Sequence, residues 1–127
     1  MRISRNGLEL LSRRHAIELR FRRRHEKPGW KDHRRMLCTK DWMLLTSKAG
    51  RGILNFVPPH GVLPYNPAAH NLVILFDIFK QEWRAVGCEE VEVISVIKTT
   101  PPETFWEYFN HFLLKMTPQE KLSFMNA

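Results

Sequence analysis

Apolar and polar residues alternate along residues 16–24, where Ile17, Leu19 and Phe21 occupy every second position and charged residues stand between them. An alternation with period two is typical of a strand with one buried face. The same residues also fit a helix that continues from the leucines before them. A helix therefore remains the alternative for this segment.

The next residues of the chain favour the strand. The stretch "HEKPGWKD" contains Pro28 and Gly29, a strong turn signal, and residues 33–45 then form a second extended segment. Extended segment, turn and extended segment together predict a hairpin. Residues 46–71 contain four prolines and three glycines, which predicts a long connection that is functional or mobile. Parts of this connection are expected to pack against the rest of the domain.

Short runs farther along the chain predict three more strands. Residues 72–79 form the clearest one, "KQE" turns the chain, and "WRAVG" and "EVISVIK" are the next two expected strands. Between these last two, "CEEV" is expected to form one turn of 3₁₀-helix. Near the N-terminus, residues 4–14 predict a short helix that Ser4 or Asn6 caps.

Two helices are predicted after the last strand, because the period of the apolar residues changes there from two to about 3.6. Thr100 is the expected cap of the first helix, and Pro102 suits its first turn. The second helix is expected to begin after Thr117 as its N-cap, with Pro118 at N1 and Glu120 at N3. The first helix is expected to pack on the strands, or alternatively to bind a partner, through one stripe of residues: Phe105, Phe109, Phe112 and Leu113.

Together these elements predict one α+β domain over residues 1–127. Its centre, residues 16–98, is expected to be a small SH3-like antiparallel β-barrel of five strands with the long 46–71 loop. An N-terminal helix precedes the barrel, and two C-terminal helices follow within residues 101–127. With 127 residues, of which 43% are apolar, the chain is able to bury a core without metal or disulfides.

Charge is distributed unevenly along the chain. Residues 1–40 hold 13 Lys and Arg against 4 Asp and Glu, whereas residues 41–127 hold 7 against 9. Residues 2–24 contain eight arginines and no lysine. Because the planar guanidinium suits phosphate and carboxylate groups, the N-terminal third predicts a polyanion or an acidic protein as partner, with a solubilising surface as the alternative.

The arginine-rich hairpin is the predicted binding site. In the strand interpretation, Arg20, Arg22 and Arg24 share the outward face, and one of the arginines at 34 and 35 adds to it from the second strand. Trp30 at the hairpin tip is expected either to stack on a base or to fold back on the barrel. The predicted set for nucleic acid or an acidic partner is Arg13, Arg14, Arg20, Arg22, Arg23, Arg24, Lys27, Trp30, Lys31, Arg34, Arg35, Lys48 and Arg51.

The sequence predicts no catalytic site, cofactor or metal. It has no G-x-S-x-G, G-x-G-x-x-G or Walker pattern. "AGRG" is too short to be a phosphate loop, although a flexible turn there would allow close approach to a phosphate. His25, His33, Cys38 and Cys88 lack the spacing of a zinc site, and both cysteines are expected to be free, buried thiols in a reducing cytoplasm.

Two stretches, "RRMLCT" and "NLVILFDIFKQEWRAVGCEEVEVI", resemble the small WYL-like, Sm/SH3-type β-barrel proteins encoded by T4-type tailed bacteriophages. The resemblance covers residues 34–97 and leaves the N-terminal arm and the C-terminal helices outside it. It implies the barrel, and small barrels of this kind in phage often act on host transcription or nucleic acid, although a fold does not fix a function. The residues that carry it are Met36, Cys38, Thr39, Phe76, Asp77, Trp83, Arg84, Val91, Val93 and Ile94.

Arginine content and resemblance together predict a non-enzymatic phage accessory protein in the cytoplasm of the bacterial host. It would bind DNA or RNA by neutralising phosphates, and so modulate transcription or DNA metabolism during host takeover. The alternative is a modulator or inhibitor of a host machine, such as RNA polymerase, a nuclease or a defence protein. It would use the same basic face around an apolar centre at Phe56, Tyr65 or Phe109. A small nuclease is a third hypothesis. No membrane partner is expected, because no apolar run spans a bilayer.

Overall fold

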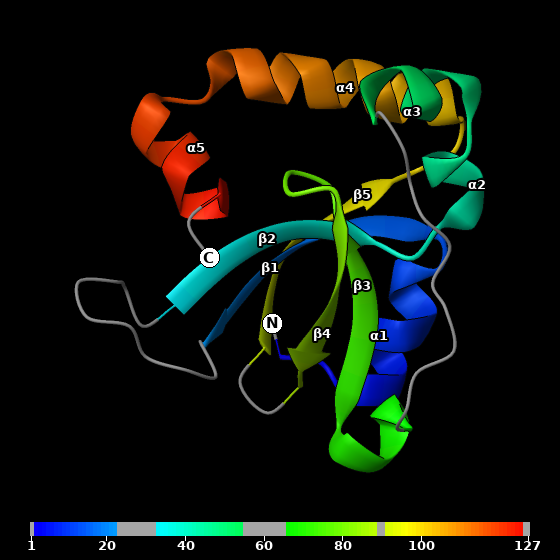
Figure 1. Ribbon diagram of the computed structural model, residues 1–127, viewed down its shortest axis with the longest axis vertical. Coiled ribbons are helices and arrows are strands. Elements are labelled where there is room, and N and C mark those ends of the chain that lie inside the picture. The colour runs from blue at the N-terminus through cyan, green and yellow to red at the C-terminus, as the bar shows by residue number, and fades with distance from the viewer. Residues whose placement is uncertain (1, 23–32, 55–65, 89–90, 126–127) are drawn as a thin grey trace.

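The computed structural model describes residues 2–22, 33–54, 66–88 and 91–125. They form an α+β structure around a five-stranded antiparallel sheet with the strand order β4-β3-β2-β1-β5 (Figure 1). The elements in chain order are α1 (Arg5–Ser12), β1 (His15–Arg22), β2 (His33–Thr39), α2 (Trp42–Leu45), α3 (Lys48–Ile53), the 3₁₀-helix η1 (Pro67–His70), β3 (Leu72–Asp77), β4 (Glu82–Gly87), β5 (Val91–Lys98), α4 (Pro102–Lys115) and α5 (Pro118–Met125).

The predicted N-terminal hairpin is confirmed. Strands β1 and β2 are antiparallel, with Leu19 opposite Met36 and Arg20 opposite Arg35, so residues 15–22 are extended and not helical. The predicted turn at Pro28 lies outside the described residues. The strands predicted after residue 71 are also confirmed as β3, β4 and β5.

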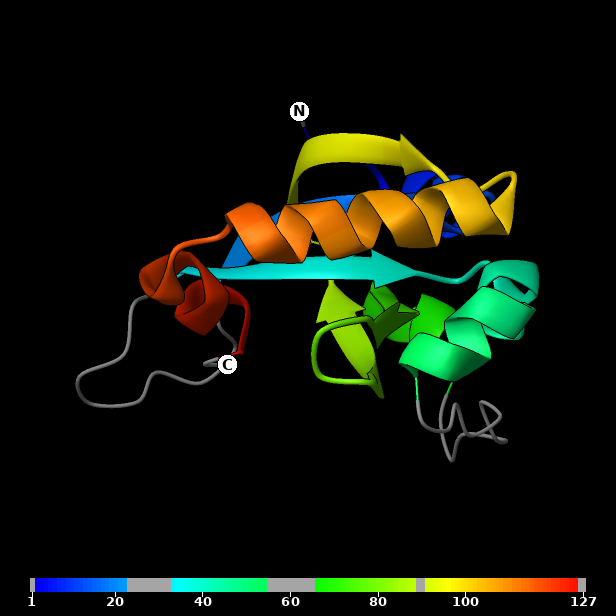
Figure 2. The same ribbon diagram turned by 90° about the horizontal axis from the view of Figure 1, so that it is seen from above.

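The sheet is open, and the expected closed barrel is not confirmed. Strand β5 pairs with β1, and β4 pairs with β3, so β4 and β5 are the two edges of the sheet. Closure of a barrel would need β5 to reach β4, and among the described residues no ladder joins them. Figure 2 shows the strong twist of the sheet, with β3 and β4 turned away from the direction of β2.

The central strands are buried on both faces. One face packs under α2, α3, α4 and α5, and its core includes Leu37, Phe76 and Trp106. The other face packs against α1. Its core contains Leu8 of α1 together with Ile17 and other apolar residues of the five strands. Figure 1 shows α3, α4 and α5 together on one side of the sheet and α1 on another. All six residues of β3 are buried. Because side chains on both faces of this strand are away from water, its sequence is a nearly continuous apolar run and does not alternate.

A β-bulge divides β5 into two halves. Ser95 lies opposite Glu18, but the next pair is Val93 with Leu19, which leaves Ile94 without a partner in the ladder. An extra residue reverses the alternation of side chains along a strand. Before the bulge, Val93 packs in the core that faces α1, whereas after the bulge Ile97 packs in the core under α4.

The extended interpretation of residues 42–45 is wrong, and residues 46–71 are not a plain loop. Asp41 caps α2 by accepting from the Leu44 amide at 3.2 Å, and Ser47 caps α3 by accepting from the Gly50 amide at 3.0 Å. Residues 67–70 add η1. Caps satisfy amides that have no partner inside a helix, so very short helices form here between the strands.

Both C-terminal helices are confirmed. Phe105 and Phe109 are buried and Phe112 packs beside them, as expected for packing on the strands, while the Leu113 side chain lies outside the description. Thr117 accepts from the Glu120 amide at 3.1 Å, as its capping pattern predicts. The expected Thr100 cap is wrong, because α4 begins at Pro102 and its first amides bond to the Pro101 carbonyl.

Candidate functional site

A row of charged positions crosses four chain segments on one face of the sheet. Arg20 of β1 lies opposite Arg35 of β2 on one side and opposite Glu92 of β5 on the other. Beyond Glu92, an isolated bridge brings Arg2 of the N-terminal segment opposite it. Directly opposed residues share a face, and neighbouring strands lie about 4.8 Å apart. We name Arg35, Arg20, Glu92 and Arg2 the arginine row.

The members of the row differ in how their charges are satisfied. Arg2 and Arg20 are exposed, and no ion pair joins either to another described residue. Arg35 instead forms an ion pair with Glu18 and lies over the Phe124 ring, with 4.6 Å from the guanidinium carbon to the ring centroid. Arg2 and Arg20 are therefore the row's accessible cations.

Glu18 lies on the same face of β1 as Arg20 but is buried. Its exposed fraction is 8% because α4 and α5 cover this part of the face. The carboxylate is satisfied on both oxygens. Arg35 donates to Oε1, and the Ser95 hydroxyl donates to Oε2 at 3.2 Å. Burial of a carboxylate needs such partners, because an unpaired charge is costly away from water.

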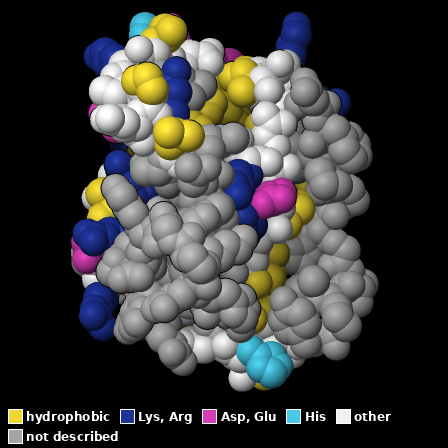
Figure 3. Space-filling view, turned by 60° about the vertical axis from the view of Figure 1, so that its left-hand side comes forward, with side chains coloured by type: hydrophobic (Ala, Val, Ile, Leu, Met, Phe, Trp, Pro, Cys, Tyr) yellow, Lys and Arg dark blue, Asp and Glu magenta, His cyan; other side chains and the backbone are white. Residues whose placement is uncertain are grey.

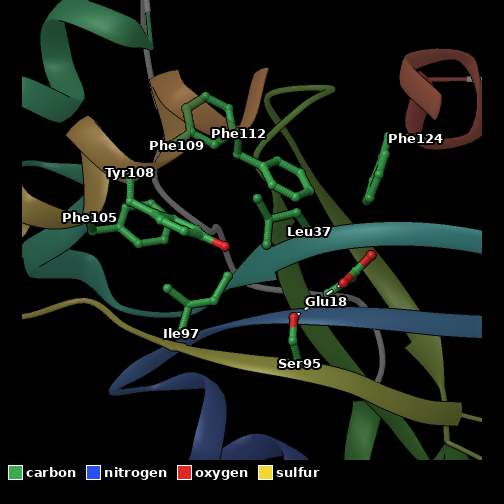
Figure 4. Close-up of a pocket in the computed structure, with 9 residues that line it drawn as sticks. All are labelled: Glu18, Leu37, Ser95, Ile97, Phe105, Tyr108, Phe109, Phe112 and Phe124. Atoms are coloured by element: carbon green, nitrogen blue, oxygen red, sulfur yellow. Dashed lines mark hydrogen bonds between the residues drawn. The ribbon is translucent and has the colours of Figure 1, made fainter. Parts of the chain in front are cut away.

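Glu18 lies at the floor of a pocket between the sheet and the C-terminal helices. The cavity has a volume of about 80 Å³. Figure 4 shows four aromatic side chains of α4 and Phe124 of α5 around the space, with Glu18 and Ser95 joined by a hydrogen bond on the strands. The lining residues are Glu18, Leu37, Ser95, Ile97, Phe105, Tyr108, Phe109, Phe112 and Phe124.

Other predicted cations do not join the row. Arg13 forms an ion pair with Glu9 at 3.1 Å, and Arg14 is exposed just before β1, at the opposite end of that strand from Arg20. Lys48 and Arg51 are exposed on α3, also toward that opposite end (Figure 1). The "AGRG" stretch is therefore helical, which overturns the expected flexible turn.

Five of the predicted residues lie outside the described part of the chain: Arg23, Arg24, Lys27, Trp30 and Lys31. Figure 3 draws the residues outside that part in grey. For Arg22 and Arg34 only the backbone is described. Their register puts Arg22 opposite His33 on the face of the row and Arg34 opposite Phe21 on the other face, so Arg35 is the β2 arginine beside Arg20. Lys and Arg side chains lie on both sides of the grey region in Figure 3.

Sequence reasoning missed Arg2, Ser95 and Tyr108. Arg2 joins the row only through its bridge to β5, and Ser95 reaches Glu18 across 77 positions of sequence. Neither contact leaves a local pattern in the chain. Tyr108 had a usable signal, because it lies on α4 one turn before Phe112, where the helical period places both rings near each other. Their centroids are 6.2 Å apart.

Titratable groups outside the row serve the structure. Burial acts to raise the pKa of Glu9, but the hydrogen bond and charge of Lys40, followed by those of Arg13, outweigh it and hold this pKa below its ordinary value. Burial raises the pKa of both thiols, and the charge of Asp77 raises that of Cys38 further. Across the described part of the chain, no three His, Cys, Asp or Glu side chains are grouped as a metal would need.

Comparison of the chain with protein-family models, curated proteins and solved structures finds no match. Within residues 2–22, 33–54, 66–88 and 91–125, no helix has both the length and the apolar character that crossing a membrane requires.

Proposed function

We propose that the protein is a non-enzymatic nucleic-acid-binding protein, and that the arginine row is part of its phosphate-binding surface. The observation that carries the proposal is the row itself, in which exposed Arg20 and Arg2 flank Glu92 beside Arg35. Guanidinium groups bind phosphate oxygens through paired donors, and such contacts position a nucleic acid without reading its sequence. A role in transcription or DNA metabolism of a phage in its bacterial host, in the cytoplasm, belongs to the same proposal.

Two local features support a surface for an anion. The row holds three arginines, against the acids Glu18 and Glu92 on the same face. Because Glu18 is already paired with Arg35, it does not neutralise the exposed arginines. The exposed charges of Arg2 and Arg20 exceed the single negative charge of Glu92 between them, and a bound phosphate would balance the excess.

Fluorescence anisotropy of labelled DNA and RNA at several salt concentrations tests the proposal. We expect a log–log slope of affinity against salt of about −3 to −5, since each neutralised phosphate contributes about −0.7 to −0.9. The double variant Arg2→Ala, Arg20→Ala should make the slope shallower by about two. The matched control is the double variant Arg14→Ala, Arg51→Ala, which removes two exposed arginines away from the row and should leave the slope unchanged.

Absence of binding at low salt would refute this function. Equal effects of the control and of the Arg2→Ala, Arg20→Ala variant would show that net charge alone matters and would remove the row from the site. Both outcomes are read from the same titrations.

A modulator of a host protein is a second candidate function, and the open edge of β5 favours it. Past the bridge to Arg2, this edge carries Ile94 and Val96, which are 45% and 42% exposed. An exposed edge of this kind suits the addition of an extended peptide. Phe109 is not its apolar centre, because this residue is only 4% exposed, and the candidates Phe56 and Tyr65 lie outside the described residues.

A further inference from the structure

The pocket lies directly beside the arginine row. Glu18 at its floor and Arg20 of the row are two positions apart on β1, so they share a face at a separation of about 7 Å along the strand. Arg35 belongs to both, since it occupies the row and donates to the Glu18 carboxylate. A chain of nucleotides whose phosphates contact the row would therefore have a base within reach of the pocket.

The polar groups in the pocket floor accept hydrogen bonds. A carboxylate has about four acceptor positions, and Arg35 and Ser95 occupy one on each oxygen of Glu18. The Ser95 proton is used on Glu18, so its oxygen also offers only lone pairs. With the Glu18 charge already balanced by Arg35, the complementary ligand group is neutral and donates a hydrogen bond.

The walls and the size of the pocket restrict the ligand further. Five aromatic rings line it, and aromatic walls favour a flat ring by stacking. The volume of about 80 Å³ is about half that of the cavity of about 150 Å³ that holds benzene in another protein, so the pocket admits one edge of a single ring while the rest of the ring stays outside. Tyr108, nearly half exposed at the rim with Phe112 beside it, leaves the pocket open on that side.

We propose that this pocket receives one unpaired cytosine of a single-stranded nucleic acid whose phosphates contact the arginine row. Cytosine is a single ring with an amino donor on its outer edge, a group that a glutamate carboxylate accepts. Thymine has the same ring size but a carbonyl oxygen in place of the amino group, and its one ring donor, N3–H, lies between two carbonyl oxygens that a carboxylate repels. Adenine has the amino donor on a two-ring base. The inference rests on the proposed function and specifies its ligand.

Affinities for oligo(dC), oligo(dT), oligo(dA) and a duplex of equal length, measured by anisotropy near neutral pH, test the inference. Oligo(dC) should bind about tenfold tighter than oligo(dT) or oligo(dA), which is the discrimination expected of one polar contact to a base edge. Glu18→Gln replaces an acceptor by a group that also donates, so the preference for oligo(dC) over oligo(dT) should disappear. Glu82→Gln, an equal charge change on the exposed surface of β4, should leave the preference intact.

A second pair of variants tests the pocket without changing the ion pair between Glu18 and Arg35. Ile97→Phe places a larger side chain into the pocket and should reduce the oligo(dC) affinity to that of oligo(dT) without changing the salt slope. Val96→Phe makes a comparable enlargement at the neighbouring position, which faces away from the pocket lining, and should change neither quantity. Circular dichroism of each variant confirms that it is folded before the comparison is made.

The outcomes separate the two proposals. Salt-dependent binding with equal affinity for the three oligonucleotides, or with no effect of Glu18→Gln and Ile97→Phe, overturns the cytosine pocket and leaves the arginine row standing. A duplex that binds as tightly as oligo(dC) overturns it as well. Loss of all binding at low salt refutes both the proposed function and the pocket.

Discussion

The guanidinium carbon of Arg35 on β2 lies over the Phe124 ring of α5, 4.6 Å from the ring centroid. The same guanidinium is the ion-pair partner of Glu18. Phe124 is buried and also stacks on Phe79, with ring centroids 4.7 Å apart. One arginine therefore holds the last helix against the sheet and balances a buried carboxylate beneath it.

Replacing Arg35 by methionine should destabilise the fold by about 1–3 kcal/mol, because Glu18 keeps its burial and loses its charged partner. The larger costs known for fully buried pairs do not apply, since the Arg35 side chain is 39% exposed. The double variant Glu18→Gln, Arg35→Met should recover part of this loss. Urea unfolding of the two single variants and the double variant measures the coupling, and strict additivity would contradict it.

Two glycines of α3 should respond oppositely to the same substitution. A Cβ on Gly50 would stand 2.7 Å from the Leu44 carbonyl oxygen and 3.0 Å from Nε1 of Trp106, whereas nothing lies within 4 Å of a Cβ on Gly52. Gly50→Ala should therefore destabilise by about 1–3 kcal/mol. Gly52→Ala should stabilise by about 0.5–1 kcal/mol through its helix propensity. Thermal and urea unfolding measure both changes in stability. Changes of the same sign in the two variants would be inconsistent with this packing.

Stability should depend on pH through Glu9. Its pKa is lowered in the folded state from an ordinary value of 4.5, so its contribution is complete above that value and is lost as the pH falls through the lower folded-state pKa. Glu9→Gln removes the ion pair with Lys40, whose Nζ lies 2.7 Å from the carboxylate. The melting temperature of the variant should be lower at neutral pH and converge on that of the parent in acid. A constant difference down to pH about 3 would disprove the assignment.

Both thiols should resist modification in the folded protein. Cys38 is fully buried and Cys88 is 9% exposed, and burial raises both pKa values, so the reactive thiolate is scarce and shielded. Near pH 8.5, reaction with a thiol-specific disulfide reagent should be at least about tenfold slower than for a free small thiol. Cys88 should react before Cys38, and urea should bring both to the ordinary rate. Rapid labelling of Cys38 without denaturant would contradict the burial.

The sequence predicted the features that depend on neighbouring residues. The alternation of Ile17 and Leu19 and the turn signal after it were enough for the first hairpin, and Thr117 was enough to place the start of α5. The short helix α3 escaped prediction because Gly50 and Gly52 resemble a turn. Its stability depends instead on contacts with α4, where Trp106 donates toward Ser47 at 3.2 Å.

The candidate site was predictable only in part, for the same reason. Arg20 was correctly expected on an exposed face. Burial of Glu18 depends on helices that begin more than eighty positions later, so its own neighbourhood contained no indication of it. Whether β5 also pairs with β4, as a closed barrel needs, is likewise decided by distant packing, and among the described residues no ladder joins these two strands.

The β-bulge at Ile94 bears on how the molecule loses its structure. Because the alternation reverses there, the first half of β5 belongs to the core against α1 and the second half to the core under α4. Melting of either core would pull a stretch of the same short strand away from β1 and expose the other core to water. The stability of each core therefore depends on the other. We expect heat or denaturant to unfold the described parts together in one cooperative transition.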